Sequence, residues 1–215
     1  MIYLRTIVTT FLALLLYATA TAQVFDNVSI DDASSVCSIS QDEQGILWFG
    51  SDNGLYSYDG YRTIPHNTNT DGIAINPRIH CIYFIHNKLY MATERGLMMY
   101  DVKTGRYAAQ PERVKGDTRA VTYYRGRLWF GGAQGLLSCN LQMDDIRMES
   151  KTLHNVYSLL ATKQGLLVGT ISGLTLLRHG KPALPIRIGD GRQPLVNALL
   201  GDGSAAWIGT EGALY

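Results

Sequence analysis

The residues best suited to bind a ligand recur at two fixed places in this sequence. Five segments share a small residue, and the residue just before it differs in each: Cys37, His80, Arg119, Tyr157 and Asn197. The residue three before the small one also differs: Ser35, Arg78, Asp117, Asn155 and Leu195. The flanking residues repeat, and most of these side chains are polar, which a packing position would not favour. Both places are therefore candidates for ligand contact.

Six of these residues form our candidate ligand-binding set: Arg78, His80, Arg119, Asn155, Tyr157 and Asn197. Amide and guanidinium groups hydrogen-bond to hydroxyls or carboxylates, and tyrosine offers an apolar ring face. The set would suit a sugar, and Arg78 together with Arg119 would suit an acidic one. The alternative is that these residues are solvated loop ends around a water-filled channel. The connection 66–78, rich in Asn and Asp, is expected at the same end, as a contact loop or as a surface loop.

Catalysis is not expected in this segment. His80 and Tyr157 could serve as acid and base, but spacing alone does not bring them together. A glycosidase needs two convergent carboxylates, whereas the acidic residues fall mainly in turns: Asp42, Asp52, Glu94 and Asp202. The sequence has no metal-ligand spacing, and we expect neither a metal nor a cofactor. Three cysteines cannot all pair, and Cys81 occupies a small-residue position that other segments fill with Ser or Ala.

A repeated sequence motif predicts the strands that carry these residues. It occurs at 47–55, 89–97, 128–136, 166–174 and 206–214. Its anchor residue (Gly50, Ala92, Gly131, Gly169, Gly209) advances by 42, 39, 38 and 40 residues, and lies 11 or 12 residues after the small residue. Turn residues separate the two, and a second turn and two further short strands follow. Four short antiparallel strands in about forty residues are typical of a propeller blade.

The sequence thus predicts an all-β protein, a β-propeller of four-stranded antiparallel blades. The blades are expected at about 33–66, 77–112, 117–152, 154–189 and, truncated, 194–215. Residues at one equivalent position are expected to pack blade against blade: Trp48, Tyr90, Trp129, Leu167 and Trp207. Four blades and part of a fifth make an incomplete ring, which would leave apolar faces open. We therefore expect a fragment of a longer chain, rather than a truncated gene product or half of an oligomer.

The first 22 residues predict export. Arg5 precedes an apolar stretch, and Ala20-Thr21-Ala22 fits a signal-peptidase site, so residues 1–22 are expected to be a signal peptide and 23–215 the partial propeller. An uncleaved membrane anchor is the alternative. The formal charge of +1 falls to 0 when Arg5 is removed with the signal. A chain with no net positive charge is not basic enough to attract phosphate backbones, so nucleic acid is not an expected partner. The expected location is the periplasm.

The unit from Val36 to Gly60 resembles the two-component regulator propeller repeat, and the resemblance extends over residues 24–215. Residues 25–32 resemble the segment before the first blade in that family, which would close the ring. Departures are Ala92 at the anchor, Asn140 and Arg178 where a strand should end in Asp, and a shifted turn glycine at Gly212. They affect the detail of single blades rather than the fold.

The resemblance implies a sensor region of a hybrid two-component system of Bacteroides-type bacteria. In that family two propellers of roughly seven blades each precede an immunoglobulin-like domain, a membrane helix, a histidine kinase, a receiver and a DNA-binding domain. The implied function is periplasmic recognition of oligosaccharides and control of genes for carbohydrate use. The implied partners are an oligosaccharide, the remaining blades and kinase of an inner-membrane parent chain, and a second copy in a homodimer. The alternatives are an exported scaffold for protein binding and a polysaccharide-degrading enzyme.

Overall fold

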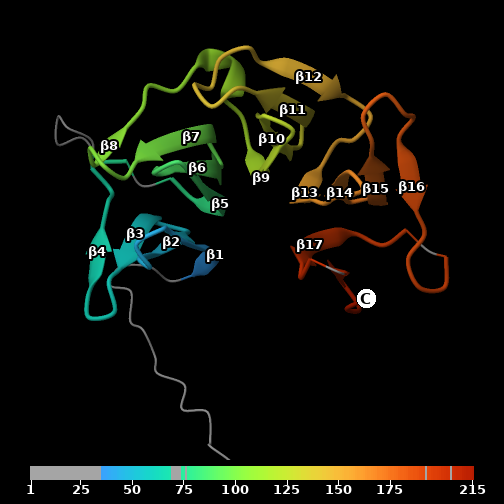
Figure 1. The fold of residues 1–215 in the computed structure, drawn as a ribbon, viewed down its shortest axis with the longest axis horizontal. Coiled ribbons are helices and arrows are strands. Elements are labelled where there is room, and N and C mark those ends of the chain that lie inside the picture. Colours follow the sequence, from blue (N-terminus) through green and yellow to red (C-terminus); the bar gives the residue numbers. More distant parts are fainter. Residues whose placement is uncertain (1–34, 69–73, 76, 192, 204) are drawn as a thin grey trace, which may run out of the picture.

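The strands form separate antiparallel sheets arranged as an arc around a central space (Figure 1). The structure is a computed structural model and describes residues 35–68, 74–75, 77–191, 193–203 and 205–215. Among these residues four sheets have four strands and one has two. The fold is therefore a β-propeller with four blades and part of a fifth, which confirms the predicted fold class. The expected signal peptide and the segment 25–32 lie outside the described residues.

Within each blade, successive strands run from the centre of the arc to its outside (Figure 1). Blade one comprises β1 (Val36–Gln41), β2 (Leu47–Ser51), β3 (Gly54–Tyr58) and β4 (Thr63–Pro65). Blade two comprises β5 (Ile79–Ile85), β6 (Lys88–Thr93), β7 (Gly96–Asp101) and β8 (Arg106–Tyr107), followed by a short 3-10 turn, η1 (Glu112–Val114). Blade three comprises β9 (Thr118–Tyr124), β10 (Arg127–Gly132), β11 (Gly135–Cys139) and β12 (Arg147–Ser150). Blade four comprises β13 (Val156–Ala161), β14 (Leu166–Thr170), β15 (Gly173–Leu177) and β16 (Leu184–Ile186), and blade five β17 (Val196–Gly201) and β18 (Ala206–Thr210).

Tight turns join the first two strands of each blade. In blade two, His86 and Asn87 have φ of 50° and 58°. Positive φ at both central residues suits the twist of a two-residue hairpin. In blade one the Oδ1 atom of Asp42 accepts hydrogen bonds from the backbone N–H groups of Gln44 and Ile46, both at 2.9 Å. The turn role predicted for Asp42 is confirmed.

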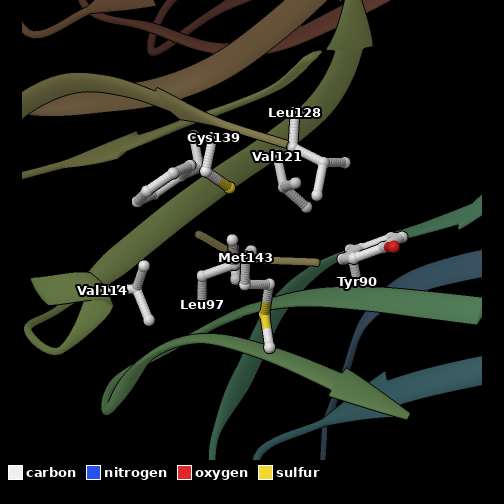
Figure 2. Packing of buried hydrophobic residues seen from close by; sticks show 9 residues of the cluster. Tyr90, Leu97, Val114, Val121, Leu128, Cys139 and Met143 are labelled. Carbon is white, nitrogen blue, oxygen red and sulfur yellow. The ribbon is translucent and has the colours of Figure 1, made fainter. Parts of the chain in front are cut away.

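The hydrophobic core lies between the blades. Figure 2 shows the cluster between blades two and three, whose buried members are Tyr90, Ala92, Leu97, Val114, Val121, Leu128, Phe130, Cys139 and Met143. The Tyr90 hydroxyl donates a hydrogen bond of 2.6 Å to the carbonyl of Leu141 in blade three. Burial raises the pKa of Tyr90 to about 12, so the hydroxyl remains a donor at neutral pH. Similar clusters fill the other three junctions between described blades.

The anchor glycine of the repeat leaves room for the next blade. A Cβ on Gly50 would lie 2.5 Å from Cγ2 of Ile79, and a Cβ on Gly169 would lie 2.7 Å from Cγ1 of Val196. Ile79 and Val196 are the first residues of the next inner strands, β5 and β17. Glycine recurs at this position because a β-branched side chain of the neighbouring blade occupies the space beside it.

In blades one and two the small residue of the inner strand also contacts the next blade. Ser38 Oγ accepts a hydrogen bond of 2.9 Å from the backbone N–H of Ile82, which links blades one and two. Cys81 Sγ lies 3.8 Å from the carbonyl of Val121, which links blades two and three. Cys81 thus replaces the serine or alanine of other blades, as predicted, and all three cysteines are free.

The recurrent large residue packs at the blade junctions, as the repeat predicts. Trp48, Tyr90 and Leu167 are buried, and Trp129 packs in the cluster between blades three and four. Trp207 holds the same position in blade five but is 47% exposed. Its side of β18 has no neighbouring blade among the described residues, as the gap between β17 and β1 shows (Figure 1).

The opposite end of the arc is open as well. Val36 in β1 is 43% exposed, although its counterparts in the other four blades are at most 6% exposed: Ile79, Thr118, Val156 and Val196. Those counterparts pack on the blade that precedes them, and the described residues include none before blade one. The two end faces therefore carry apolar side chains that the same repeat buries elsewhere.

Candidate ligand-binding rim

Each of the five inner strands contains a β-bulge near its start. In blade two, Ile79 pairs with Thr93 and Cys81 with Ala92, so His80 is the extra, unpaired residue. The same irregularity in the other blades singles out the other residues just before the small position: Cys37, Arg119, Tyr157 and Asn197. A bulge redirects the side chain of its extra residue and is common next to functional sites. The varying position of the repeat is thus the bulge position.

The neighbouring turn holds the bulge in place. In blade two the Thr93 side chain donates to the carbonyl of Gly96 at 2.7 Å and accepts from the N–H of Arg95 at 3.1 Å. The N–H of Glu94 in this turn donates to the carbonyl of Arg78, immediately before the inner strand. Blades one and four repeat the arrangement through Ser51 and Thr170. In these three blades the turn beside the bulge is therefore fixed by side-chain hydrogen bonds, while the bulge side chain itself differs.

Because every blade has the same strand order, the five bulges lie at one end of the inner strands. Consecutive inner strands contact one another from β1 through β5, β9 and β13 to β17. We use the term rim for the five bulge residues together with Asp117, which directly precedes β9. The rim residues are Cys37, His80, Asp117, Arg119, Tyr157 and Asn197.

A carboxylate connects blades two and three at this rim. Asp117 Oδ2 accepts a hydrogen bond of 3.0 Å from Arg119 Nε. Asp117 Oδ1 lies 3.2 Å from His80 Nε2, an ion-pair distance without the alignment of a hydrogen bond. Burial lowers the pKa of His80, and Asp117 partly opposes that effect while Arg119 and Arg78 reinforce it. His80 is therefore neutral at neutral pH, and its buried Nε2 has no hydrogen-bond partner among the described residues.

An aromatic contact extends the cluster into blade four. The guanidinium carbon of Arg119 lies 4.9 Å from the centre of the Tyr157 ring, a cation–π distance. His80, Arg119 and Tyr157 thus come from three consecutive blades and form one connected group. The structure brings these three members of the candidate set together.

Among the described residues, no hydrogen bond, ion pair or ring contact joins the side chains of the other three candidates to this group. Arg78 is exposed, and its charge acts on His80. Asn155 has φ of 51°, and its carbonyl accepts a hydrogen bond from the N–H of Ile171. Asn197 is exposed on β17. The binding role of these three residues therefore remains a prediction.

Asp117 and Cys37 are the two rim residues that the candidate set lacks, and Asp117 is the one that joins the connected group. It lies at one of the varying positions, yet only the packing of blades two and three shows that it touches both His80 and Arg119. The sequence does contain a hint, since a carboxylate two residues from Arg119 on an extended chain lies on the same side.

The connection after blade one is only partly a candidate for ligand contact. His66 packs between blades one and two: its Nε2 lies 2.8 Å from Ser57 Oγ and its Nδ1 2.8 Å from the Tyr100 hydroxyl. Asn67 Oδ1 accepts a hydrogen bond of 2.8 Å from the N–H of Leu55. The start of this connection is therefore structural, and residues 69–73 and 76 lie outside the described part of the chain.

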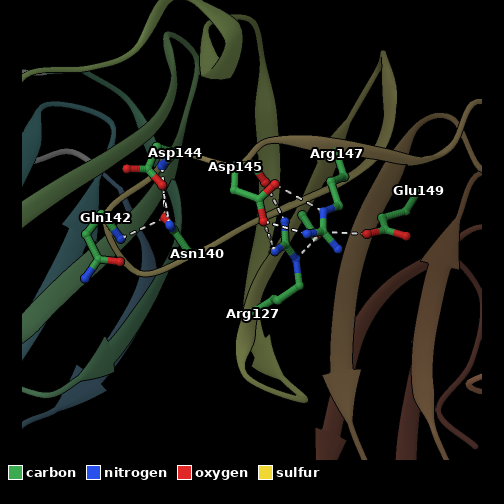
Figure 3. A network of polar contacts seen from close by, with 8 residues as sticks. Arg127, Asn140, Gln142, Asp144, Asp145, Arg147 and Glu149 are labelled. Atoms are coloured by element: carbon green, nitrogen blue, oxygen red, sulfur yellow. Dashed lines mark hydrogen bonds and ion pairs between the residues drawn. The ribbon is translucent and has the colours of Figure 1, made fainter.

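A second polar cluster, in blade three, differs from the rim because its groups satisfy one another. Arg127 donates from Nε to Ser138 Oγ at 2.9 Å, from Nη1 to Asp145 Oδ2 at 2.6 Å and from Nη2 to the Asp145 carbonyl at 2.5 Å (Figure 3). Arg147 also donates to Asp145, and Ser138 donates to Glu149. Two cations and two carboxylates within one blade leave no net charge, so this network ties β10, β11 and β12 together.

In the part of the chain that the structure describes, no group of three or more His, Cys, Asp or Glu side chains could hold a metal ion. No helix there is long and apolar enough to cross a membrane.

Known proteins share both the repeat and the fold. Residues 30–53 match the family model of the two component regulator propeller. These residues are a two-component regulator propeller repeat. Two crystal structures of the extracellular domain of one B. thetaiotaomicron protein each match this chain with a TM-score of 0.75. One structure assigns that protein as a one-component system and the other as a hybrid two-component system. The domain is 33% and 35% identical over 89% and 90% of this chain, which confirms the resemblance drawn from the repeat.

The propeller spans only part of these relatives. The aligned region covers 28% and 27% of the two crystallised chains. A further extracellular domain from B. thetaiotaomicron, assigned to a hybrid two-component system, shares the fold with a TM-score of 0.72. Its sequence is 22% identical, and the alignment covers 88% of this chain and 30% of that crystallised chain. No curated protein matches the chain in sequence.

Proposed function

We propose that this propeller is the ligand-sensing module of a hybrid two-component sensor, located outside the cytoplasm, and that its rim binds an oligosaccharide. Two observations support the proposal. The similar structures from B. thetaiotaomicron are extracellular domains, one of them assigned to a hybrid two-component system at 35% identity. The rim provides one bulge side chain from each blade, at one end of the inner strands.

The rim group that spans three blades carries the proposal. His80, Asp117, Arg119 and Tyr157 belong to or border blades two, three and four and contact one another in sequence. A ligand held by this group would contact several blades at once. Binding would then favour one relative placement of those blades, which is what a sensor has to transmit. The chemistry proposed for the module is therefore recognition, with no reaction.

The proposed partners follow from the two open end faces. Trp207 and Val36 occupy positions that a neighbouring blade buries elsewhere in the propeller. We propose that further blades of a longer parent chain cover these faces. The parent would also supply the inner-membrane anchor, the histidine kinase and the dimer contacts of the sensor.

Glycan binding to the whole exported chain tests the proposal. Wild-type protein and the double variant Arg119→Ala, Tyr157→Ala would be applied to an array of plant, host and microbial oligosaccharides, and positive glycans would be measured by calorimetry. We expect the wild type to bind and the variant to lose at least tenfold in affinity, because the guanidinium of Arg119 and the ring of Tyr157 are both removed. Tm should change little, since Arg119 is 40% exposed and neither residue belongs to the described core.

Three other outcomes would contradict the proposal in different ways. Unchanged affinity in the double variant would place binding away from the rim. Capture of a protein but of no glycan would favour the scaffold alternative. Release of new reducing ends from a bound glycan, lost in His80→Ala, would favour the enzyme alternative.

A further inference from the structure

We infer that the rim recognises an anionic group of its saccharide, a carboxylate or a sulfate, and that Arg119 is the residue that selects it. The inference rests on the proposed function and names the class of ligand for the same site. It is carried by the way in which Arg119 is held.

Two neighbours fix the guanidinium of Arg119 and leave one edge open. Asp117 binds its Nε at 3.0 Å, and the Tyr157 ring lies under its face at 4.9 Å. In the described part of the chain, neither Nη atom makes a hydrogen bond or an ion pair. The Nη edge is therefore held in place with its donors unused. An oxyanion with two coplanar acceptors can accept from such an edge in a bidentate manner, and little side-chain entropy remains to be lost.

Arg127 shows that the open edge is a property of the rim. All three nitrogens of Arg127 donate to groups of its own blade, and its side chain is 18% exposed (Figure 3). Arg119 is 40% exposed and uses only Nε. The same residue type is saturated in the outer network and unsaturated at the rim, so Arg127 is the matched control for Arg119.

The charges around Arg119 favour an anion. Arg78 is exposed and makes no ion pair among the described residues, although it is close enough to act on His80. Asp117 is the carboxylate of the group, and both of its oxygens already face cationic or ring nitrogens. Two guanidinium groups and one carboxylate leave one positive charge.

Calorimetry on the whole exported chain with matched saccharides tests the inference. The probes are trigalacturonate, its fully methyl-esterified neutral form, a sulfated galactotriose and its unsulfated parent. We expect one of the two acidic probes to bind at least tenfold more tightly than its neutral partner, and the affinity to fall as NaCl is raised. The acidic probe that binds identifies the oxyanion as a carboxylate or a sulfate.

Substitutions at Arg119 locate the selecting group. Arg119→Gln should abolish the preference for the acidic probe, and Arg119→Lys should lose at least tenfold of it, because lysine keeps the charge but not the fork. Arg127→Lys should leave the preference unchanged. Arg78→Gln changes an exposed position and should reduce the preference by about threefold to tenfold, because it removes a positive charge and leaves the Asp117–Arg119 contact intact. The Tm of each variant is measured as a control for folding.

The outcomes separate this inference from the proposed function. Equal affinity for the acidic and neutral probes, with both weakened by Arg119→Gln, would overturn the anionic ligand and retain a sugar-binding rim. An acidic preference that survives Arg119→Gln would overturn the role of Arg119. Failure of all four probes to bind, while the rim variants abolish binding of another neutral glycan, would also overturn the inference. Failure of every glycan would remove the proposed function itself.

Discussion

The junction between blades one and two and the free face of blade five show the same repeat with and without a neighbour. Trp48 at the junction is 4% exposed, and Trp207 at the equivalent position is 47% exposed. Trp48 donates from Nε1 to Asp42 Oδ2 at 2.9 Å and lies against His66 and Tyr100, with ring centres 4.9 and 5.7 Å away. The described residues around Trp207 provide no such partners.

The comparison separates what the repeat encodes from what stabilises the fold. Each blade presents the same apolar side chains toward the next one, but those side chains contribute free energy only where another blade removes them from water. Stability is therefore concentrated at the junctions. An identical substitution should have a large effect at the first junction and a small one on the free face.

Removal of the tryptophan should give the largest difference. We expect Trp48→Ala to lower the free energy of unfolding by about 3–5 kcal/mol, because it leaves a cavity among buried rings. Trp207→Ala should lower it by less than about 1 kcal/mol, since half of the side chain is already in water. Urea unfolding followed by circular dichroism measures both. Equal losses in the two variants would show that the junction is not the main source of stability.

Acid should weaken the first junction through His66. Burial lowers the pKa of His66 from 6.5 to about 4. Below pH 6.5 the unfolded chain binds a proton that the folded chain does not bind until about pH 4, so stability falls as the pH falls through this window. The loss attributable to this side chain is at most about 3 kcal/mol. It is measured as the difference between the pH profiles of wild type and His66→Gln, which lacks the titrating ring. Parallel profiles would contradict the effect.

The anchor glycine offers the smallest and most local contrast. A Cβ on Gly50 would lie 2.5 Å from Ile79 Cγ2, whereas on Gly209 the nearest atoms belong to its own blade, with Ala198 Cβ at 3.1 Å. We expect Gly50→Ala to cost about 1–3 kcal/mol by overpacking the junction, and Gly209→Ala to change stability by less than about 0.5 kcal/mol. Thermal unfolding of both variants measures the contrast. A larger loss for Gly209→Ala would show that its apolar face is already covered.

The fold was predictable because the same pattern of strands and turns occurs five times in the sequence. Constant spacing between the small residue and the anchor defines a hairpin, and the turn residues Asp42, His86 and Asn87 adopt the roles that their types favour. The packing position of Trp48 was likewise accessible from its recurrence. Local conformation and periodic burial depend on near neighbours in the chain, so one sequence contains enough information for both.

The site was predictable only as a set of positions. Variation within a repeat pointed to His80, Arg119 and Tyr157, but their spacing does not reveal that each is the extra residue of a β-bulge. It also does not reveal Asp117 as the link between two blades, or His66 as a core residue. These facts depend on contacts between different segments, and two of them, His80 with Asp117 and His66 with Tyr100, join residues more than 30 positions apart.

The sequence by itself determined the number of blades, the order of strands and the identity of the varying positions, because each follows from periodicity along the chain. Only the tertiary structure decided which of those positions act together. Arg119 obtains its fixed orientation from Asp117 before β9 and from Tyr157 in the next blade, and Trp48 obtains its burial from Tyr100 in the blade beside it. Both depend on how blades pack in space, since a side chain's charge environment and its exposure are set by whatever lies across the junction.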